Sequence, residues 1–382
     1  MTPLQSKLPN VGTTIFTVMT RLAEHHQAIN LSQGFPEFEP PDGLLDRVSH
    51  YLRTRCHQYP PMPGAMSLRT AIAVKLQDLY GVRSDPETEI TVTSGATEAL
   101  FCAIQAVVRS GDEVVVFDPC YDSYAPSVQL AGGRVVHIPL SLPVFSIDWD
   151  TLRAKLNART RLVIINSPHN PSGALITRGD LDRLAELLRP YDCYVLSDEV
   201  YEHVIFDGQT HATALAQEEL AERSFAVFSF GKTYHATGWK LGYCVAPRRL
   251  TEELRRVHQY VTFASTGPLQ YALADYLTEH PEHHRSLPAF YAERRDYFAG
   301  LLARTAFAIG PSRGTYFQLG DYSAISDMPD VEFARWLTVE HGVAVIPISV
   351  FYQEPPDLRL VRFCFAKQTA TLDEAARRLR EL

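Results

Sequence analysis

Short apolar runs alternate with longer amphipathic segments through the middle of the chain. The β-branched runs predict strands at 89–93, 113–117, 161–165, 193–197, 226–229 and 241–245. A periodic apolar pattern predicts a helix over 96–109. The run at 114–117 is apolar at every position, which is typical of a strand buried on both faces. This alternation indicates an α/β fold, in which a mainly parallel sheet lies between helices.

The pattern changes near residue 281. Amphipathic helices follow, with short strands expected around 315–319, 343–346 and 360–365 and a last helix from Leu372. Residues 1–40 carry no strong helical pattern, so we expect an arm and linker that belong to the smaller lobe. We therefore expect a large domain at 41–280 and a small α+β domain at 281–382.

Polar side chains follow four of the predicted strands. Ser94, Asn166, Asp198 and Ser229 each stand at the carboxyl end of a strand or just beyond it. Open α/β sheets bind ligands at this edge. Packing accounts poorly for polar groups gathered there, so the pattern predicts a ligand site.

Composition limits the kind of partner and compartment. The chain has 382 residues, 46% of them hydrophobic, and a net charge of −8 with a pI near 6.0. The acidic balance argues against a nucleic-acid partner, and no apolar stretch of about 18 residues predicts a membrane span. Six cysteines without a CxxC spacing indicate free thiols in a reducing compartment. We expect a soluble, cytoplasmic protein.

Lysine is rare in this chain, which has six lysines against 30 arginines. Two of the six, Lys232 and Lys240, lie within the segment 229–240. A lysine amine in a desolvated pocket can lose its proton and bond to a carbonyl carbon, whereas a guanidinium stays charged. Lys232 is therefore the candidate for a covalent lysine.

Further motifs stand before and after this segment. They are SQGFP at 32–36, SGATEA at 94–99, NSPHNPSG at 166–173, SDEVY at 197–201 and, near the end, Arg362. In this order and spacing they resemble the fold-type I, pyridoxal-phosphate-dependent aminotransferases of classes I and II. The likeness is greatest to the branch that holds bacterial methionine aminotransferases and kynurenine/glutamine transaminases. It implies a seven-stranded sheet between helices in the large domain, and pyridoxal 5′-phosphate as the cofactor.

The resemblance gives each part of the cofactor a partner. Lys232 would bind its aldehyde and then move the substrate proton, and Asp198 would pair with the protonated pyridine nitrogen. Tyr201 and Asn170 would donate to the phenolic oxygen, and Tyr121 would stack on the ring. The remaining cofactor contacts would come from Gly95, Ala96, Thr97, Ser229, Lys240 and Tyr59. A helix that begins at 96 suits a phosphate, because its first backbone N–H groups are free.

Arg362 lies in the apolar run 360–365, where a charge is out of place. Guanidinium binds a carboxylate through two parallel hydrogen bonds, so Arg362 is the candidate for the α-carboxylate of an amino acid. Arg359 competes for this role, but the family position is Arg362. Asn166 and the backbone of Gly34 should assist it.

The expected wall around the substrate side chain is aromatic, and none of its members is cationic. By resemblance it consists of Phe16, Tyr59, Tyr121, Phe263 and Phe351. Such a wall suits methionine or an aromatic amino acid. In the family Tyr59 and Phe263 come from the neighbouring subunit, which implies a homodimer with shared active sites. The run IPISVF at 346–351 lacks the glycine that many class I enzymes carry after the proline, which argues against aspartate as a substrate.

The expected activity is transfer of the amino group of methionine, or of an aromatic amino acid, to a 2-oxo acid. The alternative is a kynurenine/glutamine-type transaminase with β-lyase activity on cysteine conjugates. A third reading is the ligand-sensing module of a transcription regulator, which needs an added DNA-binding domain. His280, His283 and His284 form a dense cluster without cysteine, so we expect solvated surface there and no metal site.

Overall fold

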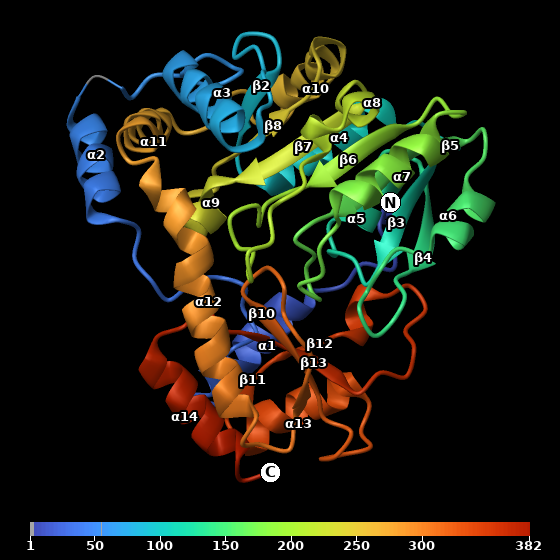
Figure 1. Ribbon diagram of the computed structural model, residues 1–382, viewed down its shortest axis with the longest axis vertical. Coiled ribbons are helices and arrows are strands. Elements are labelled where there is room, and N and C mark those ends of the chain that lie inside the picture. The colour runs from blue at the N-terminus through green and yellow to red at the C-terminus, as the bar shows by residue number, and fades with distance from the viewer. Residues whose placement is uncertain (1–3, 55) are drawn as a thin grey trace.

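A seven-stranded sheet organises the larger part of the protein, which we describe from a computed structural model that covers residues 4–54 and 56–382 (Figure 1). Its spatial order is β2-β8-β7-β6-β5-β3-β4. The strands are β2 (Ile90–Thr93), β3 (Glu113–Asp118), β4 (Arg134–Pro139), β5 (Thr160–Asn166), β6 (Tyr194–Asp198), β7 (Ser224–Ser229) and β8 (Gly242–Val245). β8 runs antiparallel to both of its neighbours, and the other pairs are parallel. The predicted mainly parallel sheet is confirmed.

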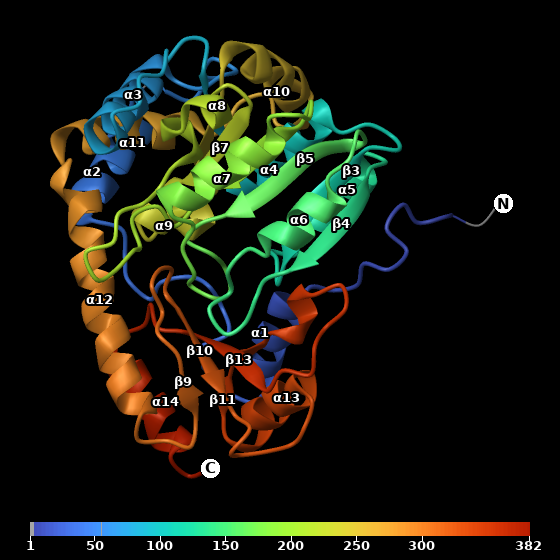
Figure 2. The same cartoon turned by 45° about the vertical axis from the view of Figure 1, so that its right-hand side comes forward.

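Helices cover both faces of this sheet (Figure 2). One face carries α4 (Ala96–Val107), α5 (Tyr124–Leu130) and α10 (Arg248–Val261). The other carries α6 (Trp149–Lys155), α7 (Arg178–Leu188) and α8 (Glu218–Ala221), with α2 (Asp42–Arg53), α3 (Met66–Tyr80) and α11 (Gly267–Glu279) towards β2 and β8. Val114 and Val116 of β3 enter the first core, while Val115 and Phe117 enter the second. The run at 114–117 is thus buried on both faces, as predicted.

A second, four-stranded antiparallel sheet has the order β12-β13-β10-β9. Its strands are β9 (Ala308–Ile309), β10 (Phe317–Asp321), β12 (Ile346–Pro347) and β13 (Leu360–Cys364). Around it lie α1 (Ile15–His25), α12 (Glu282–Leu302), α13 (Asp330–Glu340) and α14 (Thr369–Leu379). β1 (Ile29–Asn30) pairs in parallel with β11 (Val343–Ala344), so the two ends of the chain meet in this lobe. The domain boundaries expected near residues 40 and 280 stay a prediction.

Helix α1 corrects the expectation that the first 40 residues lack a helix. Thr14 caps it by accepting a hydrogen bond from the Thr17 N–H. Met19 is fully buried and packs in the core of the smaller lobe. Tertiary packing of this short apolar stripe, rather than helical propensity, therefore stabilises the helix. Residues 1–3 of the expected arm lie outside the described residues.

The histidine cluster near the start of α12 is also not the solvated surface that we expected. His284 is buried, and His283 Nε2 donates to the Thr233 carbonyl at 3.0 Å. His280 and His283 are both half-buried. The hydrogen bond of His283 anchors α12, the long helix between the two lobes in Figure 1, to the segment that carries Lys232.

Two further sequence expectations concern cysteines and membranes. All six cysteines are free thiols, and five of them are buried. Among the described residues, no helix combines the length and apolar character that a bilayer span needs. Short 3₁₀ turns complete the fold at Ala214–Ala216, Thr237–Trp239 and Ser349–Phe351.

Candidate active site

A cavity of about 180 Å³ opens at the carboxyl edge of the large sheet. The predicted site residues that line it are Gly95, Ala96, Thr97, Tyr121, Asn166, Asn170, Asp198, Tyr201, Ser229, Lys232 and Lys240. Strand register explains the convergence. Asn166 pairs with Asp198 across β5 and β6, and Gly242 pairs with Ser229. Because β8 runs in the opposite direction, Lys240, just before it, reaches the same edge.

The first turn of α4 forms a cradle for an anion. Gly95 is the N-cap residue with φ of 81°, and no side chain caps the helix there. A Cβ on Gly95 would lie 3.3 Å from Lys240 Nζ, and a Cβ on Gly242 would lie 2.7 Å from the Ala96 nitrogen. Glycine at both positions lets the helix terminus and the Lys240 ammonium approach one another. Free N–H groups, the helix dipole and this ammonium together suit a phosphate.

Lys232 lies on the short helix α9 (Phe230–Thr233), at the floor of the cavity. Its Nζ donates to the Gly34 carbonyl and to Tyr316 Oη, each at 2.9 Å. Burial lowers the pKa of this amine to about 8, and the positive charges of Arg362 and Lys240 act in the same direction. Roughly a tenth of the Lys232 amine is therefore neutral at pH 7, far more than for an ordinary lysine, and the neutral amine is the nucleophilic form.

Asp198 ends β6 and is buried at the cavity wall. Its hydrogen bonds come from neutral groups, with Tyr124 Oη at 2.6 Å and the Val200 N–H at 3.4 Å. Burial raises the pKa of this carboxyl to about 6, against the lowering effect of the Tyr124 hydrogen bond. A carboxylate held in this way favours a cation that enters the cavity.

Arg362 lies in β13 and is fully buried. Its Nη1 donates to Asn170 Oδ1 at 2.7 Å and its Nη2 to the Ser32 carbonyl at 2.9 Å, while Nε is buried and has no partner among the described residues. The guanidinium stacks on Phe317 at 3.8 Å from the ring centroid. Arg359, the competing candidate, forms an ion pair with Asp357 instead.

The two groups expected to assist Arg362 have other partners in the structure. Asn166 Nδ2 donates to the Asp198 carbonyl, and Asn166 Oδ1 accepts from the Asn170 N–H, both at 2.8 Å. The Gly34 carbonyl accepts from Lys232. Asn166 therefore reaches Arg362 through Asn170.

Four of the five predicted aromatic residues fall into two groups, and the fifth, Tyr121, lines the cavity. The rings of Phe16 and Phe351 are 5.9 Å apart, and the Arg362 guanidinium lies 5.4 and 5.9 Å from their centroids. Tyr59 and Phe263 pack edge to face at 5.4 Å and are 82% and 46% exposed. The first group therefore surrounds Arg362, whereas the second lies on the surface of its own chain.

Two tyrosines at this site were missed by the sequence reasoning. Tyr124 holds Asp198, and Tyr316 contacts Lys232 and donates to the Gly34 carbonyl at 2.6 Å. Tyr124 is the first residue of α5, and its ring meets that of the predicted Tyr121 edge to face at 5.7 Å. Tyr316 follows Thr315, whose φ of 64° turns the chain just before β10. Nothing in the sequence around Tyr316 indicates that turn.

The chain is similar to known proteins along almost its whole length. Residues 26–379 match the family described as aminotransferase class I and II. The chain is 54% identical to the methionine aminotransferase of Escherichia coli, over 99% of this chain and 98% of that protein. It is 34% identical to human kynurenine–oxoglutarate transaminase 3, over 97% of this chain and 88% of that protein.

Solved structures show the same architecture. The crystal structure of the E. coli protein YbdL, described as having a methionine aminotransferase function, superposes with a TM-score of 0.97, with both chains fully covered and 54% identity. Aspartate aminotransferase from Thermus thermophilus with maleate gives a TM-score of 0.91 at 28% identity, again with both chains fully covered. The chain belongs to the class I and II aminotransferases, enzymes of this fold that use pyridoxal phosphate.

Proposed function

We propose that this enzyme transfers the amino group of methionine, and of aromatic amino acids, to a 2-oxo acid. One observation carries the proposal: the chain is 54% identical, end to end, to a methionine aminotransferase. The surroundings of Arg362 support it. Its guanidinium lies against Phe16, Phe317 and Phe351, so a substrate carboxylate bound there has an apolar wall beside it.

The cavity fits pyridoxal phosphate residue by residue. The first turn of α4, with Ser229 and Lys240, would hold the phosphate, and Tyr121 would lie against the ring. Asp198 would face the pyridine nitrogen, because the buried carboxylate lacks a full charge partner and its pKa of about 6 falls once a cation pairs with it. When bound, the cofactor withdraws electrons from the Cα–H bond of the substrate.

Lys232 would supply both the covalent bond to the cofactor and the proton transfer. With a pKa of about 8 its Nζ can accept the Cα proton of the substrate and release it again at neutral pH. Tyr316 and the Gly34 carbonyl hold this Nζ in position through two hydrogen bonds. Tyr201 and Asn170 line the same cavity and would donate to the phenolic oxygen.

Arg362 would bind the α-carboxylate of the substrate. Asn170 Oδ1 and the Ser32 carbonyl fix the plane of the guanidinium, while its buried Nε remains without a partner. The hydrogen bond from Arg362 also orients the Asn170 amide, which leaves the Asn170 Nδ2 hydrogens for another acceptor. One arginine would thus hold the substrate and a cofactor ligand together.

We further propose a homodimer in which Tyr59 and Phe263 complete the site of the other subunit. Both rings are exposed on their own chain, as is Tyr260 at 87%. Exposed aromatic clusters of this kind mark interaction surfaces. The six free thiols favour the cytoplasm as the compartment. We also propose that the small domain comprises residues 281–382 with the arm 1–40, and the large domain residues 41–280.

A half-reaction panel tests the proposed function. The holoenzyme is mixed with methionine, phenylalanine, glutamine, kynurenine or aspartate without an acceptor, and the change in cofactor absorbance is followed. Methionine should convert the cofactor fully and yield one equivalent of its 2-oxo acid. Kynurenine as the preferred donor, or pyruvate release from a cysteine conjugate faster than methionine turnover, would favour the alternative transaminase with β-lyase activity. No spectral change with any amino acid would contradict the aminotransferase assignment.

A further inference from the structure

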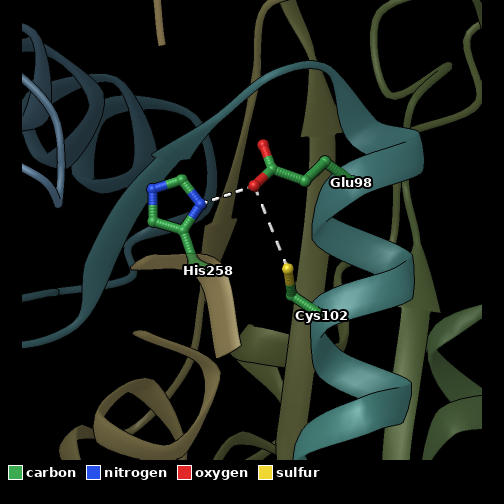
Figure 3. Close-up of side chains that lie close together, drawn as sticks. All are labelled: Glu98, Cys102 and His258. Carbon is green, nitrogen blue, oxygen red and sulfur yellow. Dashed lines mark hydrogen bonds and ion pairs between the residues drawn. The ribbon is translucent and has the colours of Figure 1, made fainter. Parts of the chain in front are cut away.

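A buried cluster of three ionisable side chains lies behind the anion cradle, outside the cavity lining. Figure 3 shows Glu98 and Cys102 on one side of α4, with His258 of α10 facing them. His258 Nδ1 lies 2.6 Å from Glu98 Oε1, and Cys102 Sγ lies 4.0 Å from the same oxygen. The side chains of His258 and Glu98 are 0% and 6% exposed.

His258 and Glu98 form a hydrogen-bonded pair and not two ligands of one metal ion, because 2.6 Å between Nδ1 and Oε1 is too short for a cation to bind both; tetrahedral zinc ligands lie roughly 3.3 Å apart. His258 Nε2 lies 3.0 Å from the Met62 carbonyl, which can only accept, so this nitrogen carries a hydrogen. Burial raises the pKa of Glu98, but the hydrogen bond and charge of His258 and the Ser94 N–H outweigh it and leave the pKa below its usual range. Glu98 is therefore a carboxylate, and the His258 ring bridges it to the Met62 carbonyl. Burial also raises the pKa of the Cys102 thiol to about 12, so it is not a thiolate.

The pair joins the cradle to two distant segments. Glu98 Oε2 accepts from the Ser94 N–H at 2.5 Å, directly before Gly95 of the cradle. On the other side, His258 binds the Met62 carbonyl through its ring, three residues from Tyr59. The His258 carbonyl accepts from the Phe263 N–H at 3.1 Å and so fixes the turn at which Phe263 leaves α10.

A buried polar pair of this kind is a weak source of stability, because desolvation of both groups offsets their attraction. The place of the pair in the fold is more informative than its stability. One carboxylate and one imidazole ring hold the start of α4, the loop that carries Tyr59 and the turn that carries Phe263. A hydroxyl contact of 3.1 Å between Ser94 and Ser265 links the same segments a second time.

We propose that Glu98 and His258 are positioning residues, which fix the phosphate cradle and couple it to the two aromatic residues at the subunit interface. The inference rests on the proposed function, since it takes the cradle as the phosphate site and Tyr59 and Phe263 as interface residues. Among the residues described, neither Glu98 nor His258 lines the cavity that would hold the cofactor. Their effect would pass through the backbone at 94–97 and the segments around 62 and 263.

The test compares three purified variants: Glu98→Ala, Glu98→Gln and, as a matched control, Glu113→Ala. Glu113 is equally buried but binds Arg134 and Arg159 at the opposite edge of the sheet. The dissociation constant of pyridoxal phosphate is measured by fluorescence titration of the cofactor-free protein. Inorganic phosphate alone serves as a second probe, through its protection against thermal unfolding.

We expect Glu98→Ala to raise the dissociation constant of pyridoxal phosphate at least tenfold and to abolish protection by inorganic phosphate. Glu98→Gln should stay within about threefold of wild type, because its amide can accept from Ser94 and donate to a neutral His258. Glu113→Ala should lose thermal stability while keeping the wild-type affinity for pyridoxal phosphate.

Wild-type affinity in Glu98→Ala, or an equal loss of affinity in Glu113→Ala, would overturn the inference. If Glu98→Ala does not fold, His258→Gln replaces it. That variant keeps a donor for Glu98 but loses the contact with Met62, and we expect an affinity loss of at least threefold, whereas unchanged affinity contradicts the coupling. Failure of the wild-type protein to bind pyridoxal phosphate would instead overturn the proposed function, and this inference with it.

Discussion

Lys232 and Asp198 line one cavity, and burial shifts their pKa values in opposite directions. The pKa of the Lys232 amine falls to about 8 and the pKa of the Asp198 carboxyl rises to about 6, so both values approach neutral pH. Such shifts are typical of residues that exchange protons or pair with a charged ligand. Arg362 differs from these two residues, because its guanidinium is hydrogen-bonded to Asn170 and to the Ser32 carbonyl and stacks on Phe317.

Replacing Lys232 with alanine should reduce kcat by at least about 10³-fold, because the variant lacks both the covalent amine and the proton carrier. The phosphate site on α4 is untouched, so pyridoxal phosphate should still bind. Borohydride reduction followed by peptide mass analysis provides the check, since wild-type protein should retain the cofactor on Lys232. Cofactor fixed to another lysine in the variant would contradict this assignment.

Asp198 gives a pH-dependent prediction for the cofactor-free protein. Its pKa rises from 3.8 to about 6 on folding, so the folded state binds more protons between these values and stability falls as pH increases. The shift corresponds to ~3 kcal/mol. Asp198→Asn should therefore gain free energy of unfolding relative to wild type as pH rises from 4 to 6. Urea unfolding across this range measures the difference.

Glu113→Gln is the control for that experiment. Burial raises the pKa of Glu113, but hydrogen bonds from Asn157 and Arg134 outweigh burial, so its pKa lies below the usual value. Its stabilisation is present above the unfolded pKa and is lost as pH falls. The stability deficit of Glu113→Gln should therefore shrink towards acidic pH. An identical pH trend in both variants would show that Asp198 does not titrate as described.

At the scale of elements, the phosphate-binding role of the start of α4 can be tested by substitution of Gly95. Gly95→Ala should raise the dissociation constant of pyridoxal phosphate about tenfold, because its Cβ would crowd Lys240 Nζ and its φ of 81° disfavours a side chain. Gly81→Ala is a matched control with φ of 69° and open space around the added Cβ. Gly81 is left-handed with ψ of 12°, whereas Gly95 with ψ of 166° lies in a region that almost only glycine adopts, so Gly81→Ala should lose about 1 kcal/mol of stability and Gly95→Ala more. Equal cofactor affinity in the two variants would contradict the proposal that the start of α4 binds the phosphate.

Elements buried on both sides were the predictable ones. β3, β5, β6 and β7 are apolar runs whose polar residues stand at their ends, so both the strands and the site edge could be read from sequence. β4 was not predicted, because this edge strand has a single partner and mixes Arg134 and His137 into its pattern. α1 was missed because it is short and depends on packing against the distant residues of the smaller lobe.

The site residues also divide into those that the sequence predicts and those that it does not. Lys232 and Asp198 stand in local motifs, so the sequence was sufficient to place them. Tyr124 and Tyr316 were missed because their importance depends on what lies opposite them, Asp198 in one case and Lys232 in the other. Long-range contacts of this kind leave no periodic pattern. The proposed roles of the predicted site residues remain to be tested by the variants above.

At the scale of the whole molecule, shared active sites can be tested by subunit mixing. Lys232→Ala and Tyr59→Ala subunits, each of low activity as homodimers, are unfolded together and refolded as a mixture. One site of each mixed dimer combines an intact Lys232 with an intact Tyr59 from the other chain, so activity should return to about a quarter of wild type for random pairing. Activity no higher than the sum of the two separate variants would contradict a shared site.

The most direct test of the central claim compares kcat/KM for methionine and aspartate with one 2-oxo acid acceptor. Burial of a methionine side chain against Phe16 and Phe351 contributes about 1.5 to 3 kcal/mol, while a second carboxylate there would be desolvated without a partner. The account predicts that methionine exceeds aspartate at least tenfold, or ~1.4 kcal/mol. Aspartate turning over as efficiently as methionine would contradict it.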